Sequence, residues 1–137
     1  MKPIGLVPEL AVSNLRKSLD FYRDLLGFTV VYSREEENFA YLQLGNAEIM
    51  LDQIGSTRTW ETDKLDHPFG RGVNFQIEVE NIDGLYQKLQ TQNISIFLSV
   101  EDKWYRKNDK LLGQRQFAAQ DPDGYLLRFY QDLGTKE

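Results

Sequence analysis

The feature that most constrains this chain is a pattern of short elements that occurs twice along it. In the first half, residues 7–12 form a mainly apolar stretch that reads as a strand. Apolar side chains then recur with the spacing of one helix face, at Leu15, Leu19, Tyr22 and Leu26. Stretches rich in β-branched and aromatic residues follow, at residues 28–32, 39–44 and 47–52. The predicted order is therefore β-α-β-β-β.

Turn and cap residues stand where this order requires them. Asn14 is a typical N-cap for the predicted helix, and Gly27 is a typical residue just past its C-terminus. The pair Gly45-Asn46 separates the last two strands and predicts a two-residue hairpin turn. Pro8 lacks an N–H, so the first strand should lie at a sheet edge or carry a break.

The second half repeats the pattern with one insertion. Strands are predicted at residues 73–79, 94–100, 116–120 and 125–131, with a helix at 82–89. Val12, Asn14 and Leu15 recur 67 positions later as Val79, Asn81 and Ile82, whereas Met50 recurs 78 positions later as Arg128. The difference leaves eleven extra residues, which we assign to a long loop at 101–113. An internal duplication is the economical explanation.

These observations predict one α+β domain over residues 1–137, made of two tandem βαβββ modules. Module 1 covers about residues 4–53 and module 2 about residues 72–133. No hydrophobic period holds between them, and Gly55, Pro68 and Gly70 mark residues 54–71 as a linker.

Composition excludes several classes of function. The chain has no Cys, which excludes disulfides, a thiolate nucleophile and cysteine-ligated zinc. A net charge of −5 disfavours nucleic acid as a partner and is compatible either with simple solubility or with attraction of a cationic ligand. Apart from a cluster at Lys103, Arg106, Lys107 and Lys110, the basic residues are scattered. No apolar run is long enough for a membrane span, so we expect a cytoplasmic protein.

Several motifs resemble the vicinal oxygen chelate superfamily, which includes glyoxalase I, extradiol dioxygenases, fosfomycin-resistance thiol transferases and bleomycin-resistance proteins. The first-module signature is VPELAVSNL at residues 7–15, followed by Ser18, Phe21-Tyr22 and LLGF at 25–28. The second-module signature is QDPDG at residues 120–124, followed by Leu126 and Arg128. The Val-Pro opening and QRQF at residues 114–117 resemble the bleomycin-resistance branch most.

The resemblance implies that each module curls a mixed sheet into a U and that the two modules enclose a cleft. Metal-dependent members hold their ion with one residue from the first and one from the last strand of each module. The matching positions here are Val7, Met50, Asn74 and Arg128. Val7 and Met50 offer no hard ligand, and the Arg128 guanidinium would repel a divalent ion. The sole histidine, His67, lies in the linker. We therefore expect no metal and no other cofactor.

Strand alternation predicts which side chains share the cleft face with these positions. They are Glu9 on the first strand, Glu48 and Asp52 on the fourth, Gln76 and Glu78 on the fifth, and Tyr130 on the last. The acids form a cation-favouring pocket if they converge, and otherwise a solvated strand face. Arg128 would then either pair with an acid or contact an anionic group of the ligand. The run Glu35-Glu36-Glu37 is either a solvated turn or a steering patch at the cleft mouth.

Aromatic side chains would form the other part of a binding site. Phe39 and Tyr41 lie on the third strand, where core packing is the alternative, and Trp104 lies in the predicted long loop among polar neighbours. The branch carries a stacking Trp just before the Gly at 113, where this chain has Leu111-Leu112. The predicted ligand-binding residues are Glu9, Phe39, Tyr41, Glu48, Met50, Asp52, Asn74, Gln76, Trp104 and Arg128.

The resemblance implies a metal-independent protein that sequesters a cationic, partly aromatic small molecule, and a homodimer whose N-terminal strand crosses to the partner subunit. Two alternatives stay open at this point. One is a metal-dependent lyase, dioxygenase or thiol transferase of the same superfamily. The other is a binder of an unidentified metabolite without a role in drug resistance.

Overall fold

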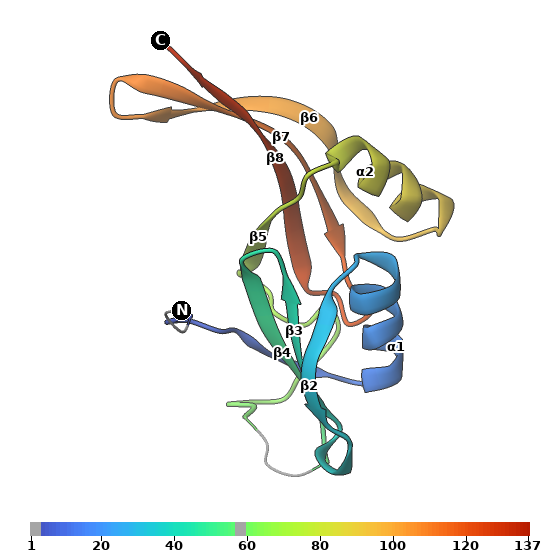
Figure 1. Cartoon of the computed structure of the whole chain (residues 1–137). Helices are drawn as coiled ribbons and strands as arrows, with labels where there is room; N and C mark the ends of the chain where they lie inside the picture. Colours follow the sequence, from blue (N-terminus) through green and yellow to red (C-terminus); the bar gives the residue numbers. More distant parts are fainter. Residues whose placement is uncertain (1–3, 57–59) are drawn as a thin grey trace. The chain divides into compact units, whose positions relative to one another are not determined.

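The computed structural model describes residues 4–56 and 60–137. The chain divides into two compact units, Met1–His67 (unit 1) and Pro68–Glu137 (unit 2). The boundary lies within the predicted linker at residues 54–71. Each unit is an α+β module with one four-stranded mixed sheet, as Figure 1 shows for each unit by itself.

Unit 1 contains the first β-α-β-β-β sequence. Its elements are β1 (Glu9–Val12), α1 (Leu15–Leu19), the π-helical segment η1 (Asp20–Leu25), β2 (Thr29–Arg34), the 3₁₀ turn η2 (Glu35–Glu37), β3 (Phe39–Leu44) and β4 (Ala47–Gln53). The strand order is β1-β4-β3-β2, with β1 parallel to β4 and the other pairs antiparallel. The first strand thus begins just after Pro8 and lies at the sheet edge, as predicted from the missing N–H of proline.

Unit 2 has the same topology. Its elements are β5 (Asn74–Glu78), α2 (Ile82–Thr91), β6 (Ile96–Lys107), β7 (Lys110–Gln120) and β8 (Leu126–Lys136). The strand order is β5-β8-β7-β6, with β5 parallel to β8. The registers match as well, since Glu9 pairs with Met50 in unit 1 and Gln76 pairs with Arg128 in unit 2. These pairs are related by the offsets of 67 and 78 found in the sequence, so the predicted duplication is confirmed.

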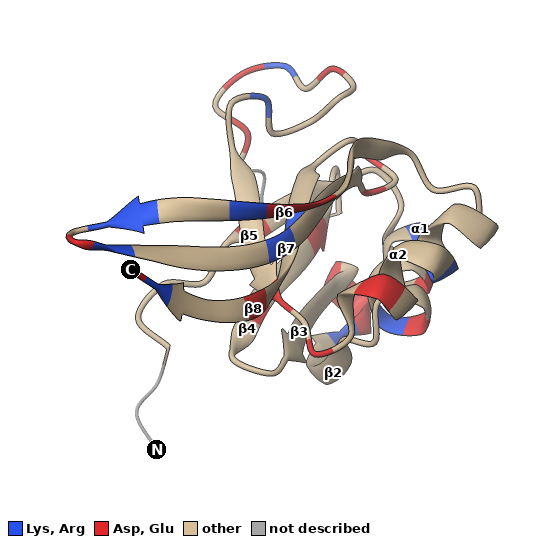
Figure 2. Cartoon of the chain, turned by 90° about the horizontal axis from the view of Figure 1, so that it is seen from above, with Lys and Arg blue, Asp and Glu red and all other residues tan. Residues whose placement is uncertain are grey.

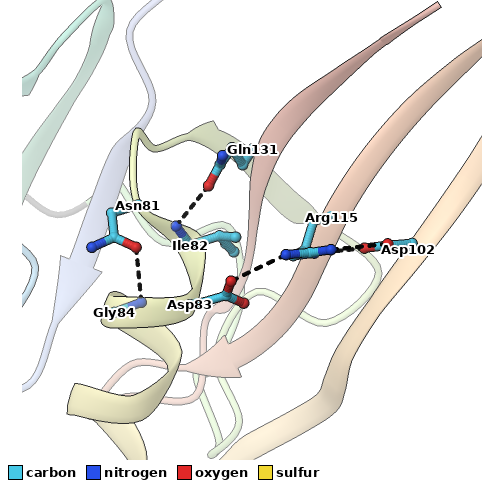
Figure 3. Close-up of polar contacts among 7 residues, drawn as sticks. All are labelled: Asn81, Ile82, Asp83, Gly84, Asp102, Arg115 and Gln131. Atoms are coloured by element: carbon cyan, nitrogen blue, oxygen red, sulfur yellow. Dashed lines mark hydrogen bonds and ion pairs between the residues drawn. The ribbon is translucent and has the colours of Figure 1, made fainter.

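The helix N-termini are built in the same way in both units. Asn14 Oδ1 accepts a hydrogen bond from Lys17 N at 3.1 Å, and Asn81 Oδ1 accepts one from Gly84 N at 3.1 Å. A glutamine from the last strand adds a second acceptor. Gln53 Oε1 accepts from Leu15 N at 2.8 Å in unit 1, and Gln131 Oε1 accepts from Ile82 N at 3.1 Å in unit 2 (Figure 3). Both predicted N-caps are therefore confirmed, and each helix is tied to its own sheet.

Each sheet buries one face beneath its helix. In unit 1, Ile49 and Leu51 of β4 are buried, as are the aromatic side chains Phe21, Tyr22 and Phe28, which pack edge to face. In unit 2, Leu127 and Phe129 of β8 are buried, and Tyr86 of α2 packs on Phe117 with ring centroids 5.0 Å apart. The alternate residues of β4 and β8 point to the opposite face, which leaves that face available to a ligand.

The prediction that residues 101–113 form a loop is wrong. They form the outer part of a long β6–β7 hairpin, in which Trp104 pairs with Gly113 and Lys107 with Lys110. The turn places Asn108 at φ 58°, a left-handed conformation that Asn tolerates. Charged residues stand at consecutive positions of this hairpin arm, at 101–103 and at 106–107, so hydrophobic alternation could not reveal the strands. Figure 2 shows Lys and Arg as blue segments along β6 and β7. Backbone pairing with β8 as far as Lys136 extends the sheet beneath the arm.

The helices of the described residues are short. None is long and apolar enough to span a membrane.

Candidate ligand-binding site

The open face of the unit 1 sheet collects a large part of the predicted site. Met50 lies at its centre, with Glu9 of β1 and Tyr41 of β3 as its cross-strand partners. Asp52 follows Met50 on the same face and pairs with Phe39. Strand alternation therefore placed these residues correctly on one face.

This face lines a cavity of about 530 Å³, which we call the unit 1 cavity. Its lining residues are Glu9, Tyr32, Arg34, Glu37, Phe39, Met50, Asp52 and Trp60. Sequence reasoning missed Tyr32, Arg34 and Trp60, whereas Glu37 belongs to the acidic run that was considered as a solvated turn or a steering patch. Tyr32 and Arg34 share a face of β2, which extends two residues beyond the predicted strand end at 32. Tyr32 already lay within the predicted strand, and a longer strand would have added Arg34. Trp60 lies in the linker and carries no local signal.

Aromatic rings form one wall of the cavity. The Tyr32 ring stacks on Tyr41, with centroids 5.1 Å apart and planes inclined by 18°. Its centroid lies 6.0 Å from that of Phe39. Phe39 is 3% exposed, so it belongs to the buried core and to the cavity lining at once. Flat faces of this kind bind planar or cationic groups.

Two carboxylates of the cavity, Glu9 and Asp52, have raised pKa values. Burial, followed by the neighbouring Asp52 carboxylate, raises the pKa of Glu9 above its ordinary value, against an opposing effect of Arg34. Burial, followed by Glu37 and Glu61, raises the pKa of Asp52, again against Arg34. Negative charge at these two positions is therefore disfavoured in the empty cavity, and a bound cation would relieve it.

Arg34 supplies a positive charge within the cavity. Its guanidinium carbon lies 4.0 Å from the centroid of the Phe39 ring and 6.0 Å from that of Tyr32. Its Nε donates to Glu37 Oε1 at 2.8 Å. The acidic run at residues 35–37 is thus a 3₁₀ turn whose last member holds Arg34 over the aromatic wall.

Glu48 lies on the same sheet face but does not line the cavity. The Tyr41 hydroxyl donates to Glu48 Oε1 at 2.5 Å. This hydrogen bond is the main cause that raises the pKa of Tyr41 to about 12. Glu48 therefore orients Tyr41, which in turn stacks on the cavity residue Tyr32.

In unit 2, the predicted residues Gln76 and Arg128 are in contact. Arg128 Nη2 donates to Gln76 Oε1 at 2.5 Å, and Asn74 lies on the same face of β5. Among the described residues, no carboxylate forms an ion pair with Arg128, and its buried Nε has no hydrogen-bond partner. Of the two alternatives for Arg128, pairing with an acid is therefore not observed.

Trp104 does not share this face. It follows Asp102 on one side of β6, and Asp102 accepts a hydrogen bond from Arg115 Nε at 2.7 Å. Arg115 also donates to Asp83 of α2 at 3.1 Å, which identifies the helix side of the sheet (Figure 3). The Arg128 face carries Gln116 and Glu101 instead, joined at 2.8 Å.

The Trp104 ring lies on the backbone of Gly113, where an added Cβ would meet it at 2.5 Å. The Lys136 Nζ lies 4.0 Å from the ring centroid. An aromatic side chain therefore covers Gly113, but it comes from the paired strand β6 and not from the residue just before Gly113. Local sequence inspection before Gly113 could not find it.

A second cavity, of about 240 Å³, lies in unit 2 and contains none of the predicted site residues. Its lining residues are Pro68, Phe69, Gly70, Arg71, Gly72, Val73, Phe97, Gln120, Gly124 and Leu126. Among the residues that line it, Arg71 is the one that carries a charge.

The residues at the family's metal positions do not fit a divalent ion. Met50 offers a thioether, Asn74 a single amide oxygen, and Arg128 a guanidinium already bonded to Gln76. Over residues 4–56 and 60–137, no three His, Cys, Asp or Glu side chains are grouped as metal ligands.

A comparison with protein families places most of the chain in one family. Residues 6–129 match the family model described as the glyoxalase/bleomycin resistance protein/dioxygenase superfamily. The chain belongs to this superfamily.

Among characterised relatives, a bleomycin resistance protein of Geobacillus stearothermophilus is 34% identical and covers 93% of this chain and 96% of its own. A lactoylglutathione lyase of Haemophilus influenzae is 26% identical, with 93% of this chain and 91% of its own covered. The crystal structure of TioX from Micromonospora sp. ML1 is similar at a TM-score of 0.71 and 19% identity, covering 96% of this chain and 100% of its own. That last similarity concerns the fold alone.

Proposed function

We propose that this protein is a metal-independent small-molecule-binding protein, similar to bleomycin resistance proteins, that sequesters a cationic, partly aromatic ligand. The observation that carries the proposal is the unit 1 cavity, whose lining combines the carboxylates of Glu9 and Asp52 with the rings of Tyr32 and Phe39. A volume of about 530 Å³ is in the range of small-molecule sites.

A cationic ligand is favoured because both kinds of lining residue attract it. A cation between Glu9 and Asp52 would oppose the burial and repulsion that raise their pKa values. An aromatic face contributes about 0.5–2 kcal/mol toward a cation, more when water is excluded. The relatives named bleomycin resistance proteins support a resistance role.

The predicted contacts outside the cavity are proposed for each unit by itself. In unit 2, Arg128 and Gln76 offer hydrogen-bond donors and an amide to an acidic or carbonyl group of a ligand. Tyr41, Glu48 and Asn74 remain proposed contacts on the open faces of their sheets. Trp104 is a proposed stacking surface on the hairpin arm, although it faces the helix side of its own sheet.

Titration calorimetry with copper-free bleomycin and with benzamidine tests the proposal. The variant pair E9Q/D52N removes both cavity charges, and we expect it to weaken cation binding by about tenfold or more. E80Q/D109N is a matched control, because it removes the same two charge types from exposed positions in unit 2. Equal affinity in the two double variants, or no binding by wild type, would contradict the proposal.

The alternative of a metal-dependent enzyme rests on the similarity to a lactoylglutathione lyase. Elemental analysis of the purified protein separates the two functions. We expect less than a stoichiometric amount of any divalent metal, because thioether and guanidinium side chains occupy two of the metal positions. One tightly held divalent ion per chain would favour the enzyme.

We also propose a homodimer. The edge strand β1 follows Pro8, whose carbonyl already accepts from Met50 N at 2.9 Å, and the segment before it is not part of the sheet. Exposed Ile4 and Leu6 in this segment give it apolar surface to bury. Light scattering after size exclusion should give twice the chain mass of 16.0 kDa.

A further inference from the structure

Arg34 occupies the region of the unit 1 cavity where the proposed cation would bind. Its guanidinium carbon lies 4.0 Å from the Phe39 ring centroid, within the range of a cation–π contact. Its Nε donates to Glu37, another lining residue, at 2.8 Å. An aromatic face on one side and a carboxylate at the edge is the environment that a planar guanidinium prefers.

We propose that Arg34 is an internal stand-in for the cationic group of the ligand, and that a ligand carrying a guanidinium or amidinium group displaces it. This inference rests on the proposed function and makes it more specific. Arg34 then sets both the affinity and the preferred shape of the cation. A planar, delocalised cation reproduces both of its contacts, whereas a compact ammonium reproduces the charge alone.

The contacts of Arg34 are suited to exchange. The side chains of Arg34 and Glu37 are 43% and 39% exposed, so water competes for their ion pair and holds it weakly. Arg34 is the last residue of β2, and the turn after it ends at Asn38, whose φ is 51°. A long side chain at a strand end can move into solvent without changing the sheet.

The remaining charges of the cavity also favour exchange. Glu9 and Asp52 keep raised pKa values although Arg34 acts to lower both, because burial and neighbouring carboxylates outweigh it. The positive charge of Arg34 thus offsets only part of the effects that disfavour negative charge at Glu9 and Asp52. A ligand cation in the place of Arg34 would lie in a cavity that these acids also line.

Binding of benzamidine and of butylamine to R34Q tests the inference by calorimetry. We expect R34Q to bind benzamidinium about fivefold more tightly than wild type, because no internal cation must leave. The gain for butylammonium should be smaller, and R34K should lie between R34Q and wild type for benzamidinium. R23Q is the matched control, since it removes an arginine from an exposed pair with Asp24, and it should bind as wild type does.

A nuclear magnetic resonance titration follows Arg34 itself. In the free protein, the Nε–H proton of Arg34 should be shifted upfield by the Phe39 ring and should return toward its ordinary position as benzamidinium saturates the cavity. An Arg34 signal that keeps its shift at saturation, or an R34Q variant that binds equally or more weakly, would overturn the displacement.

If neither wild type nor R34Q binds any cation, both the displacement and the proposed function are contradicted. Wild-type binding that depends on Glu9 and Asp52 but not on Arg34 would overturn only the displacement.

Discussion

The two units share one topology and differ in what their open faces carry. The registers are equivalent, yet the pair Glu9 and Met50 in unit 1 corresponds to Gln76 and Arg128 in unit 2. The first face is a cavity with acids and aromatic rings, whereas the second is a hydrogen-bonded layer around a guanidinium. The β2–β3 hairpin is short, while β6 and β7 form a long arm.

The shared features are those that hold each module together. A cap asparagine, a glutamine from the last strand and parallel pairing of the first strand with the last occur in both units. The differing features are exposed or half-buried and contribute little to the core. A duplicated frame therefore fixes the positions of the open faces, and the side chains at those positions determine which chemistry each face offers.

The largest expected difference between the units is in the free energy of unfolding that is lost when the turn before the last strand is mutated. Asp121 is 5% exposed, and its Oδ1 accepts from the N–H groups of Asp123 and Tyr125, both at 2.9 Å. We expect Asp121→Ala to lower the free energy of unfolding by about 3 kcal/mol, since buried donors lose a charged acceptor. The unit 1 residue 78 positions earlier is the exposed Gln43, and Gln43→Ala should change it by less than about 0.5 kcal/mol. Equal losses in urea denaturation would contradict this contrast.

The next largest expected loss of stability concerns the hairpin arm of β6 and β7. Gly113→Ala places a Cβ against the Trp104 ring and should cost about 1–2 kcal/mol together with a change in tryptophan fluorescence. In a double-mutant cycle with Trp104→Ala, removal of the ring should abolish most of this cost. An unchanged cost in the Trp104→Ala background would mean that Gly113 is needed for a different reason.

The paired glutamines should behave alike. Gln53→Ala and Gln131→Ala each remove the acceptor for the first helical N–H, and each should cost about 1 kcal/mol in chemical denaturation. The two values should agree within about 0.5 kcal/mol. A marked inequality would show that the duplicated contacts are no longer equivalent in energy.

The smallest effect is a difference in pH dependence. The pKa values of Glu9 and Asp52 are raised in the folded protein, so their ionisation destabilises the fold above the raised values, and this loss disappears as pH falls through them. E9Q/D52N should therefore gain about 0.5 kcal/mol at neutral pH, after allowance for solvent screening, and the gain should vanish in acid. Stability curves from pH 3 to 7 measure this.

Asp102 should respond in the opposite direction. The hydrogen bond from Arg115 lowers the pKa of Asp102, so its contribution to stability is present above its ordinary pKa and is lost as pH falls through the lowered value. Asp102→Asn should thus lower stability at neutral pH, with a difference that disappears in acid. The same sign for both variants would contradict the assigned causes.

The sequence predicted the frame of this protein because its signals are local. The caps Asn14 and Asn81 and the turn at Gly45-Asn46 each depend on a few neighbouring residues. The offsets of 67 and 78 were confirmed by the strand registers because the glycines and caps tie sequence position to strand position.

The candidate site was predicted only in part. Glu9, Phe39, Met50 and Asp52 follow from alternation once their strands are known. Trp60 comes from a segment without a period, and Arg34 lies beyond a strand end that was placed too early, although Tyr32 lay within the predicted strand. Trp104 was assigned to a loop because the arm is stabilised by backbone pairing and cross-strand contacts, which leave no hydrophobic pattern.

The most direct test of the central claim is a map of amide chemical shifts on adding copper-free bleomycin to the ¹⁵N-labelled protein. The account predicts that the largest changes lie at the cavity residues Tyr32, Phe39, Met50 and Asp52 of unit 1. Changes centred on Phe97, Gln120 and Leu126, which line the apolar cavity of unit 2, would contradict it.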